Sequence, residues 1–420
     1  MLSTDRIQPY PQNPFYWQYK GVPVLLLGGS VEDNLFQITD IEAHLNLLHS
    51  VGGNYVRCTM SSRDDDDAWP FERDPDTGLY DLEKPGQNFW DRFDYARKPW
   101  QNNPYNPINN QNYNAEESGL ATSIDSHPGQ RESAFFRTVP TLENNELILR
   151  YQRAQLDELL KRSLPYANVL YCIDNENNES PEWGKYWSLY IKSQAGDVLV
   201  QTTEMWDAWD LQSAQHRHTL DHPKLYSFFD LSQNNHRHGE EHWQNPQNIR
   251  QFIVNTGYIR PMNSVKIYGA NTGPFGTHRD SQEHLWRNIF GGLASSRFHR
   301  PESGLGLGKI AQAHPRSLRD LTDQIDIFTC APHNDLLTER SANEAFCTAN
   351  PGVEYAIFFP DGGNVVLNTA RAEGNKISVC WLKIRQSTWQ DEEIIDAKKR
   401  LRRVTPTKEG YWAVLIKAVE

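Results

Sequence analysis

The sequence has few cysteines, no long apolar segment and no excess of basic residues. Its 420 residues include five cysteines, which are scattered and form no CxxC pair, so a disulfide framework or a cysteine zinc site is excluded. Apolar runs such as 24–27 are far too short to cross a bilayer. Lys and Arg total 42 and Asp and Glu total 54, a formal charge of −12 without the basic excess of a nucleic-acid binder. We therefore expect neither nucleic acid nor a membrane as a partner.

A secretion signal is also missing from the start of the numbering. The first twenty residues contain Pro9, Pro11 and Pro14 and no apolar core of the kind a signal peptide needs. We expect a cytoplasmic protein, or a secreted or periplasmic one if a leader was removed. The oligomeric state does not follow from the sequence.

Aromatic residues are abundant in an otherwise hydrophilic chain. Thirteen Trp and eighteen Tyr occur among many Asn and Gln residues. Flat aromatic faces next to amides and carboxylates suit sugar rings, which stack through their C–H faces and hydrogen-bond through their hydroxyls. At any single position, a core role for the aromatic ring is an equal alternative.

Short apolar runs alternate with helical patterns along the first 330 residues. This alternation favours a (β/α)8 barrel over an open sheet, and no GxGxxG follows the first run, so a dinucleotide-binding sheet is not expected. Helices are expected near 41–51, 146–164, 181–192, 248–254, 283–293 and 317–328. The expected strands are 24–27, 55–60, 168–173, 198–203, 226–231, 265–268 and 297–299.

The third strand of this barrel is hard to locate. Residues 60–146 contain an aspartate run, Asp64–Asp67, many asparagines and several prolines, but no clean buried strand. The best candidate is 89–95, so the barrel is expected to be irregular here. The aspartate run could hold a hard cation, but a solvated loop is the simpler interpretation.

After residue 340 the pattern changes to short strands. Residues 355–359 and 365–367 flank Pro-Asp-Gly-Gly, which predicts a hairpin. Further strands are expected at 377–384 and 411–416. We therefore predict two domains, a catalytic barrel over residues 1–338 and an antiparallel β-sandwich over 339–420.

Two glutamates follow adjacent predicted strands of the barrel. Glu176 ends Ile-Asp-Asn-Glu after the fourth strand, and Glu204 follows the fifth. Barrel enzymes hold their reactive groups at these strand ends. Cleavage of an acetal needs one acid to protonate the leaving oxygen and a second carboxylate to attack or to activate water. We predict Glu176 and Glu204 as this catalytic pair.

The segment 168–176, Asn-Val-Leu-Tyr-Cys-Ile-Asp-Asn-Glu, resembles the fourth-strand signature of clan A glycoside hydrolases. The resemblance implies that Glu176 is the general acid/base and that Asn175 contacts a sugar hydroxyl. The helices around 183–192 and 287–292 and the segment 297–300 are also similar to that clan. The similarity is greatest to a subgroup with an apiosidase-like barrel and a C-terminal β-sandwich once described as collagen-binding, which 355–363 and 412–415 resemble.

The seventh predicted strand departs from this resemblance. The clan has its nucleophilic glutamate there, whereas this chain has Val-Lys-Ile-Tyr-Gly-Ala-Asn at 265–271. Three explanations remain. The second carboxylate has moved to Glu204 or Asp207, Tyr268 is the nucleophile as tyrosine is in sialidases, or the site binds sugar without cleaving it. We favour relocation.

Further polar and aromatic residues lie at the same predicted strand ends and are candidates for sugar binding. Trp206 is predicted to stack on a sugar ring, together with Trp69 and Trp209. The candidates for polar contacts to the substrate are Asp174, Asn175, Asp207, Gln233, Asn234, Asn235, Tyr268, Arg297 and His299.

Histidines crowd the region around the sixth strand, at 216, 218, 222, 236, 238 and 242. A His-x-His pair on an extended segment places both rings on one face, as in zinc sites. Imidazoles also bind sugar hydroxyls, however, and we expect no metal and no other cofactor. A metal-dependent sugar lyase or hydrolase is the weaker alternative.

The sequence as a whole predicts a glycoside hydrolase that acts in carbohydrate metabolism. Its expected substrate is an oligosaccharide derived from a complex polysaccharide, cleaved by two-carboxylate chemistry. The competing hypothesis is a carbohydrate-binding protein on a hydrolase barrel that has lost catalysis, because the seventh strand carries no carboxylate.

Overall fold

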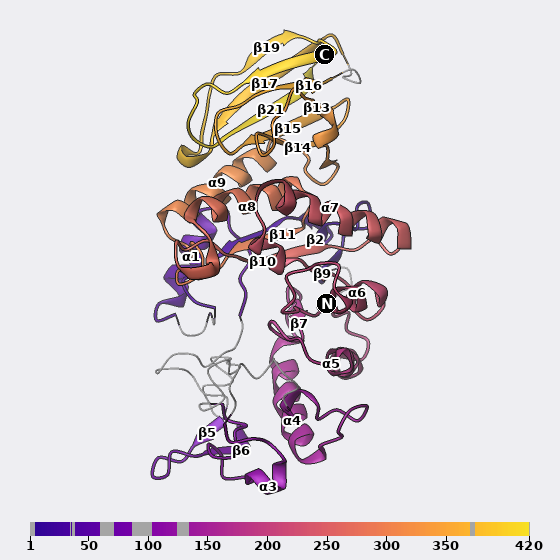
Figure 1. Cartoon of the computed structure of the whole chain (residues 1–420), viewed down its shortest axis with the longest axis vertical. Helices are drawn as coiled ribbons and strands as arrows, with labels where there is room; N and C mark the ends of the chain where they lie inside the picture. The colour runs from indigo at the N-terminus through magenta and orange to yellow at the C-terminus, as the bar shows by residue number, and fades with distance from the viewer. Residues whose placement is uncertain are drawn as a thin grey trace.

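The computed structural model divides along its long axis into three layers, with a C-terminal β domain at one end, a barrel in the middle and a small lobe at the other end (Figure 1). No helix among the described residues is long and apolar enough to span a membrane. The structure describes residues 5–33, 35, 38–58, 71–85, 103–123, 134–369 and 374–419.

Parallel strands and helices alternate along the part of the chain that forms the barrel, as the spacing of the apolar runs predicts. The strands are β4 (Leu26–Gly29), β7 (Tyr171–Cys172), β8 (Thr202–Thr203), β9 (Phe229–Asp230), β10 (Met262–Ile267) and β11 (Ser295–Phe298). The helices are α1 (Ile41–Ser50), α4 (Glu146–Ser163), α5 (Pro181–Ala195), α6 (Ala214–Asp221), α7 (Gly239–Thr256), α8 (His278–Phe290) and α9 (Lys309–Thr322). Short 3-10 turns follow two of the strands: η5 (Ser232–His236) and η6 (Gly273–Phe275).

The order of the strands is that of a (β/α)8 barrel. Four of them form a parallel sheet in the order β4-β11-β10-β9, and Gly28 of β4 bridges Tyr55 of the second barrel position. On the other side, the Ser227 amide donates to the Thr202 carbonyl at 3.0 Å and links the β9 segment to β8, which pairs with β7. The third strand is not found among the described residues, and its candidate at 89–95 lies outside them.

A small antiparallel sheet lies across the amino end of the barrel strands. It contains β1 (Gln8–Pro9), β2 (Trp17–Tyr19) and β3 (Val22–Val24). Trp17 is fully buried, and its indole donates to Asn263 of β10 at 3.0 Å. Because β3 takes residues 22–24, the first barrel strand begins two residues later than the apolar run predicts.

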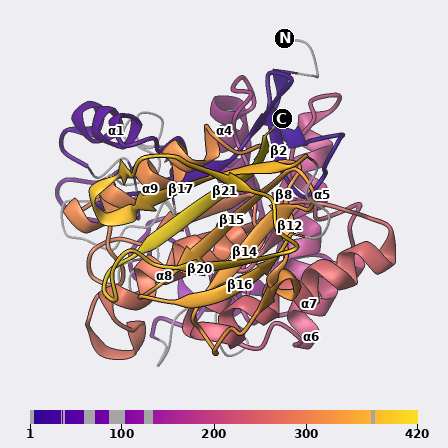
Figure 2. The same ribbon diagram turned by 90° about the horizontal axis from the view of Figure 1, so that it is seen from above.

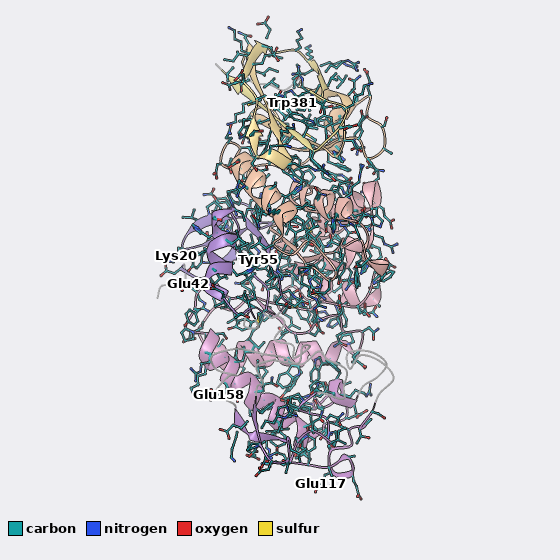
Figure 3. All side chains as sticks on the ribbon, turned by 90° about the vertical axis from the view of Figure 1, so that its left-hand side faces the viewer. Lys20, Glu42, Tyr55, Glu117, Glu158 and Trp381 are labelled. Carbon is teal, nitrogen blue, oxygen red and sulfur yellow. The ribbon has the colours of Figure 1, made fainter. Side chains whose placement is uncertain are left out.

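The lobe occupies the place of the third barrel unit in the sequence. Its described elements are a β5 (Phe71–Arg73) and β6 (Tyr80–Pro85) hairpin, α3 (Ala115–Ser118) and η4 (Ala134–Phe136). Their apolar side chains form a separate core with α4 and α5, in which Phe136 meets Trp183 with ring centroids 5.1 Å apart. Figure 3 shows Glu117 and Glu158 in this layer, far from Trp381 in the C-terminal domain.

The C-terminal domain contains two antiparallel sheets. The larger sheet contains β12 (Ala331–Pro332), β14 (Phe346–Asn350), β15 (Glu354–Phe359), β17 (Lys376–Lys383), β18 (Thr388–Trp389), β19 (Glu393–Asp396) and β21 (Trp412–Val419). The smaller sheet contains β13 (Leu337–Thr338), β16 (Asn364–Asn368) and β20 (Arg400–Val404). Two 3-10 turns, η7 (Asn334–Leu336) and η8 (Ile384–Gln386), complete the domain.

The larger sheet is buried on both faces. Ile357 and Phe359 of β15 belong to the core between the two sheets, whereas Phe358 between them belongs to the barrel core. The Phe358 ring stacks on Trp286 of α8 with centroids 5.3 Å apart. Figure 2 shows this sheet lying over the barrel helices. The domain therefore covers one flank of the barrel.

The hairpin predicted between 355–359 and 365–367 is wrong. β15 pairs with β14 and β21 in the larger sheet, and β16 pairs with β13 and β20 in the smaller one. Pro360–Gly363 thus carries the chain from one sheet to the other, because the apolar residues of both strands face the shared core. The first strand of the larger sheet, β12, lies before residue 338, where the sequence predicts the domain boundary. The boundary itself stays a prediction.

Candidate active site

Glu176 lies four residues beyond the end of β7, at the carboxyl end of the barrel strands. Its backbone has φ of 57°, in the left-handed region that residues other than glycine rarely adopt. The next residue, Asn177, bridges Trp206 in the segment after β8 and holds this turn in place. Such strain persists only where the surrounding structure imposes it, which is frequent at active sites.

Three side chains converge on one oxygen of the Glu176 carboxylate. Lys266 Nζ of β10 lies 2.6 Å from Glu176 Oε1, and the Tyr268 hydroxyl donates to the same oxygen at 2.6 Å. The Gln233 amide also donates to it, at 3.3 Å. Lys266 is fully buried, whereas the Glu176 side chain keeps 12 % of its surface exposed. An ammonium group and two neutral donors stabilise the ionised form of a carboxylate.

An aromatic row leads from the protein surface to this carboxylate. We use that name for Trp209, His236 and Tyr268. The Trp209 and His236 rings stack with centroids 4.3 Å apart, and His236 lies 4.9 Å from the Tyr268 ring. Trp209 is 51 % exposed, and burial lowers the pKa of His236 to about 4, so that ring is neutral at pH 7. A half-exposed indole beside polar rings is suited to stacking on a sugar.

A second charged group surrounds Asp33, beyond the end of β4. His299 Nδ1 lies 2.8 Å from Asp33 Oδ1, Arg57 lies 3.8 Å from the same oxygen, and Arg300 lies 3.6 Å from Oδ2. Burial opposes ionisation, but His299, Arg57 and Arg297 hold the pKa of Asp33 well below its usual range. Burial also lowers the pKa of His299 to about 3.

The Asp33 group connects to the Glu176 turn through Arg57. The Arg57 guanidinium donates to Asn175 Oδ1 at 2.5 Å. Asn175, predicted to contact a sugar hydroxyl, thus has a protein partner for its carbonyl oxygen and lies beside Glu176 in sequence. The contact ties the segment after the second barrel strand to the segment after the fourth.

Two aspartates lie at the ends of β7 and β9: Asp174 is half-buried two residues beyond β7, and Asp230 is buried and ends β9. Asp174 Oδ1 accepts the Met205 amide at 2.9 Å, and Asp230 accepts the Ser232 amide at 2.9 Å and its hydroxyl at 3.1 Å. Burial is the main cause that raises the pKa of both groups to about 6. Asp174 was expected to bind substrate; its contact with Met205 makes it part of the support for the β7 and β8 strand ends.

The structure does not bring Glu204 to Glu176. The Glu204 carboxylate points towards α5, where a Cβ added to Gly184 would lie 1.4 Å from its Oε1. Burial, followed by the charge of Asp174, raises its pKa well above the usual range, and Tyr226 and Thr219 interact with it. Because side chains alternate along an extended strand, this residue faces the helices rather than the barrel axis.

Trp206 is almost completely buried, and its indole donates to Thr219 of α6 at 2.8 Å. It is therefore a core residue, and the predicted stacking on sugar does not fit this position. Trp69 lies outside the described residues. Asp207 is half-buried, and its backbone amide donates to the Asn177 carbonyl at 2.9 Å.

The amides of η5 divide between two roles. Gln233 contacts Glu176, as described above. Asn234 donates to the His242 carbonyl at 2.8 Å, and Asn235 donates to Ser264 at 2.8 Å. Both asparagines are nearly completely buried. They fix the turn that carries Gln233 rather than facing a substrate.

Arg297 and His299 of the eighth strand are both buried. Arg297 donates to the Val265 carbonyl at 3.1 Å and to Ser30, and burial lowers its pKa to about 10. His299 contacts Asp33 and the edge of Tyr268, with ring centroids 5.3 Å apart. Arg297 thus supports the barrel interior, and His299 packs against the Tyr268 end of the aromatic row.

The histidines that crowd the sequence separate in space. His216 and His218 lie on helix α6, so the extended His-x-His geometry expected for a zinc site does not occur there. His236 ends η5, His238 immediately precedes α7, and His242 lies within α7.

Reasoning from the sequence missed three charged residues that contact Glu176, Asn175 or one another at this site: Asp33, Arg57 and Lys266. Lys266 had a recognisable signal, because it is a charged residue between apolar neighbours in a strand whose described residues are all buried. A buried lysine requires a partner. Asp33 follows a strand as Glu176 does, and Arg57 lies two residues beyond the bridge at Tyr55, but polar residues at such positions are too common to be diagnostic.

No protein-family model matches the sequence, and no curated protein matches it. Solved structures do resemble the fold. A glycoside hydrolase family 5 protein from Bacteroides vulgatus ATCC 8482 superposes with a TM-score of 0.66 at 12 % identity, over 99 % of this chain and 94 % of that one. A second glycoside hydrolase superposes with a TM-score of 0.62 at 9 % identity, over 99 % and 97 %.

These similarities cover the barrel and the C-terminal domain together. At identities this low they establish the fold alone. The chain therefore has the fold of glycoside hydrolase barrels related to family 5, as the Asn-Glu strand end predicts.

Proposed function

We propose that the protein hydrolyses a glycosidic bond at the carboxyl end of its barrel and that Glu176 is the catalytic carboxylate. The observation that carries the proposal is the convergence of Lys266, Tyr268 and Gln233 on Oε1 of a partly exposed glutamate. The aromatic row beside it supplies a surface for a sugar ring. The proposed substrate is an oligosaccharide from a complex polysaccharide, and the proposed subgroup is the apiosidase-like one.

The contacts of Glu176 favour one role over another. A carboxylate next to an ammonium group stays ionised, and an ionised carboxylate attacks the anomeric carbon or activates water. A general acid must instead carry a proton. We therefore assign Glu176 as nucleophile or base, although the clan resemblance implies the acid/base role.

Tyr268 offers a second scheme of bond cleavage at the same site. Its hydroxyl donates to Glu176 at 2.6 Å, so the carboxylate could remove the phenolic proton as the oxygen attacks carbon. A mechanism-based 2-fluoro-glycoside inactivator separates the schemes. Peptide mass spectrometry would locate the sugar adduct on Glu176 in the first scheme and on Tyr268 in the second.

The test of the proposal is a comparison of two glutamine variants. Purified protein is incubated with oligosaccharides from plant, algal and bacterial polysaccharides, and released sugars are measured by chromatography. Glu176→Gln should lower turnover by at least about a thousandfold, since it removes the reacting group. Glu182→Gln is the control, because Glu182 lies in the first turn of α5 and pairs with Lys185 at 3.2 Å on the partly exposed side of that helix. Full turnover by Glu176→Gln would refute the assignment.

A specific observation favours the alternative of sugar binding without cleavage. Lys266 and Tyr268 occupy the strand on which the related clan has its nucleophile, and Glu204 faces α5 instead of the barrel axis. In this case glycans would bind the wild-type protein, Trp209→Ala would weaken that binding, and no product would be released from any oligosaccharide.

A further inference from the structure

A cluster of two histidines and an aspartate lies outside the candidate active site. His238 directly precedes α7, and Asp280 and His284 lie one turn apart on α8. One ligand atom from each residue lies within 4.8 Å of the other two. We propose that His238, Asp280 and His284 form a binding site for a divalent metal ion with the ligand preference of Zn²⁺.

His284 is the ligand that is already in place. Its side chain is fully buried, and its Nε2 lies 2.9 Å from the Arg237 carbonyl oxygen. A carbonyl oxygen can only accept, so Nε2 carries the proton and Nδ1 presents a lone pair. This buried Nδ1 has no hydrogen-bond partner among the residues that the structure describes. A buried acceptor left without a partner is costly, and a metal ion would satisfy it.

The Asp280 carboxylate is oriented by the start of α8. Its Oδ2 accepts the Thr277 amide at 2.8 Å and the Thr277 hydroxyl at 2.7 Å. Its Oδ1 lies 3.0 Å from His238 Nδ1. Metal-binding histidines commonly donate their second N–H to a carbonyl, and metal-binding carboxylates commonly accept further hydrogen bonds. His284 and Asp280 both show this pattern.

His238 is the movable ligand. Its side chain is 57 % exposed, and it makes no capping hydrogen bond to α7. Tetrahedral zinc with ligands at about 2.0–2.1 Å holds its ligand atoms roughly 3.4 Å apart. Because the His238 ring is exposed, it can rotate towards an ion held by Asp280 and His284, and water completes the fourth position.

The residues around His284 hold its imidazole ring in place. The His242 ring stacks on His284 with centroids 4.2 Å apart, and Arg287 is paired with Glu283 at 2.7 Å. Two imidazoles and one carboxylate are a common donor set for zinc, whereas Ca²⁺ and Mg²⁺ prefer oxygen ligands alone.

The test measures metal binding directly and does not depend on enzymatic activity. Protein dialysed against a chelator is titrated with ZnCl₂ by calorimetry and then analysed for bound zinc. We expect one zinc per chain, a higher melting temperature with zinc, and no binding of CaCl₂. His238→Ala should weaken zinc binding at least about tenfold, and because His238 is exposed, the variant should fold.

His333→Ala is the matched control. His333 Nδ1 lies 3.1 Å from Asp335 Oδ1 in the C-terminal domain, nearly the distance between His238 and Asp280. No third ligand joins this pair among the described residues. Zinc binding should be unchanged in this variant.

Two results would overturn the proposal. One is the absence of stoichiometric zinc after titration of the wild-type protein. The other is binding that survives His238→Ala but is lost in His222→Ala, which would place the metal at the His218 and His222 pair of α6, whose ring centroids are 4.3 Å apart.

Discussion

Lys266 Nζ and Glu176 Oε1 lie 2.6 Å apart although β9 and β8 separate their strands in the barrel. The lysine is fully buried and the glutamate is partly exposed. The pair therefore joins two distant strand ends and holds the proposed catalytic carboxylate in one orientation.

Lys266→Met should reduce both stability and turnover. Removal of one partner from a buried ion pair leaves an unpaired charge and costs about 3–5 kcal/mol. The Lys266→Met, Glu176→Gln double variant should regain part of the lost free energy of unfolding, because the second change removes the unpaired carboxylate charge. Urea unfolding of the four proteins gives the coupling energy, which should exceed about 1.5 kcal/mol.

The exposed pair Lys185 and Glu182, 3.2 Å apart, is the comparison for this cycle. Its coupling should stay below about 1 kcal/mol. Equal coupling in the two cycles would show that Lys266 does not hold Glu176.

Glu204→Gln should leave the activity within about threefold of wild type. The carboxylate lies against α5 and not beside Glu176, and glutamine has the shape of the protonated acid that burial favours. Rates are measured on whichever substrate the wild-type protein cleaves. A loss as large as that of Glu176→Gln would restore Glu204 as the second catalytic carboxylate.

Trp209→Ala should weaken substrate binding without unfolding the protein. The indole is 51 % exposed and stacks on His236, so its loss removes the proposed sugar-stacking face but little core. We expect KM to rise about tenfold, which corresponds to about 1.4 kcal/mol, with an unchanged melting temperature.

Tyr166→Ala is the control for an exposed aromatic ring, because Tyr166 precedes β7 at the opposite end of the barrel strands. Its KM should equal that of wild type. If both variants raise KM alike, the aromatic row is not the substrate surface.

Asp230→Asn should reduce the loss of stability that the wild-type protein shows as the pH rises from 4 to 6. The fold raises the pKa of Asp230 from 3.8 to about 6, chiefly by burial. In that pH range the folded protein keeps a proton that the unfolded chain has released, so stability falls as pH rises. The shift corresponds to about 3 kcal/mol for this group.

Melting temperatures at pH 4 and pH 7 measure this effect. The difference between the two pH values should be smaller in Asp230→Asn than in wild type. Asp391→Asn, at an exposed position of the C-terminal domain, should leave the difference unchanged. A variant that behaves like wild type would show that Asp230 ionises normally in the fold.

The barrel was predictable because its signals are local. Ser180 caps α5 and Pro181 occupies its first turn, which are local signals of a helix start, and apolar runs locate most of the strands within a few residues. The hairpin prediction failed because Pro-Asp-Gly-Gly specifies a turn but not the partner of the strand that follows. That choice depends on which sheet the apolar face of β16 can cover.

The sequence by itself determined the alternation of strands and helices and the position of Glu176 after a buried strand, since both follow from periodicity and turn chemistry between near neighbours. Only the tertiary structure decided which groups meet that carboxylate. Strand twist and pleating direct Lys266 and Tyr268 inward to Glu176 and turn Glu204 outward to Gly184 of α5. Residues far apart in the chain carry no local mark of such contacts, because these arise only when the barrel closes.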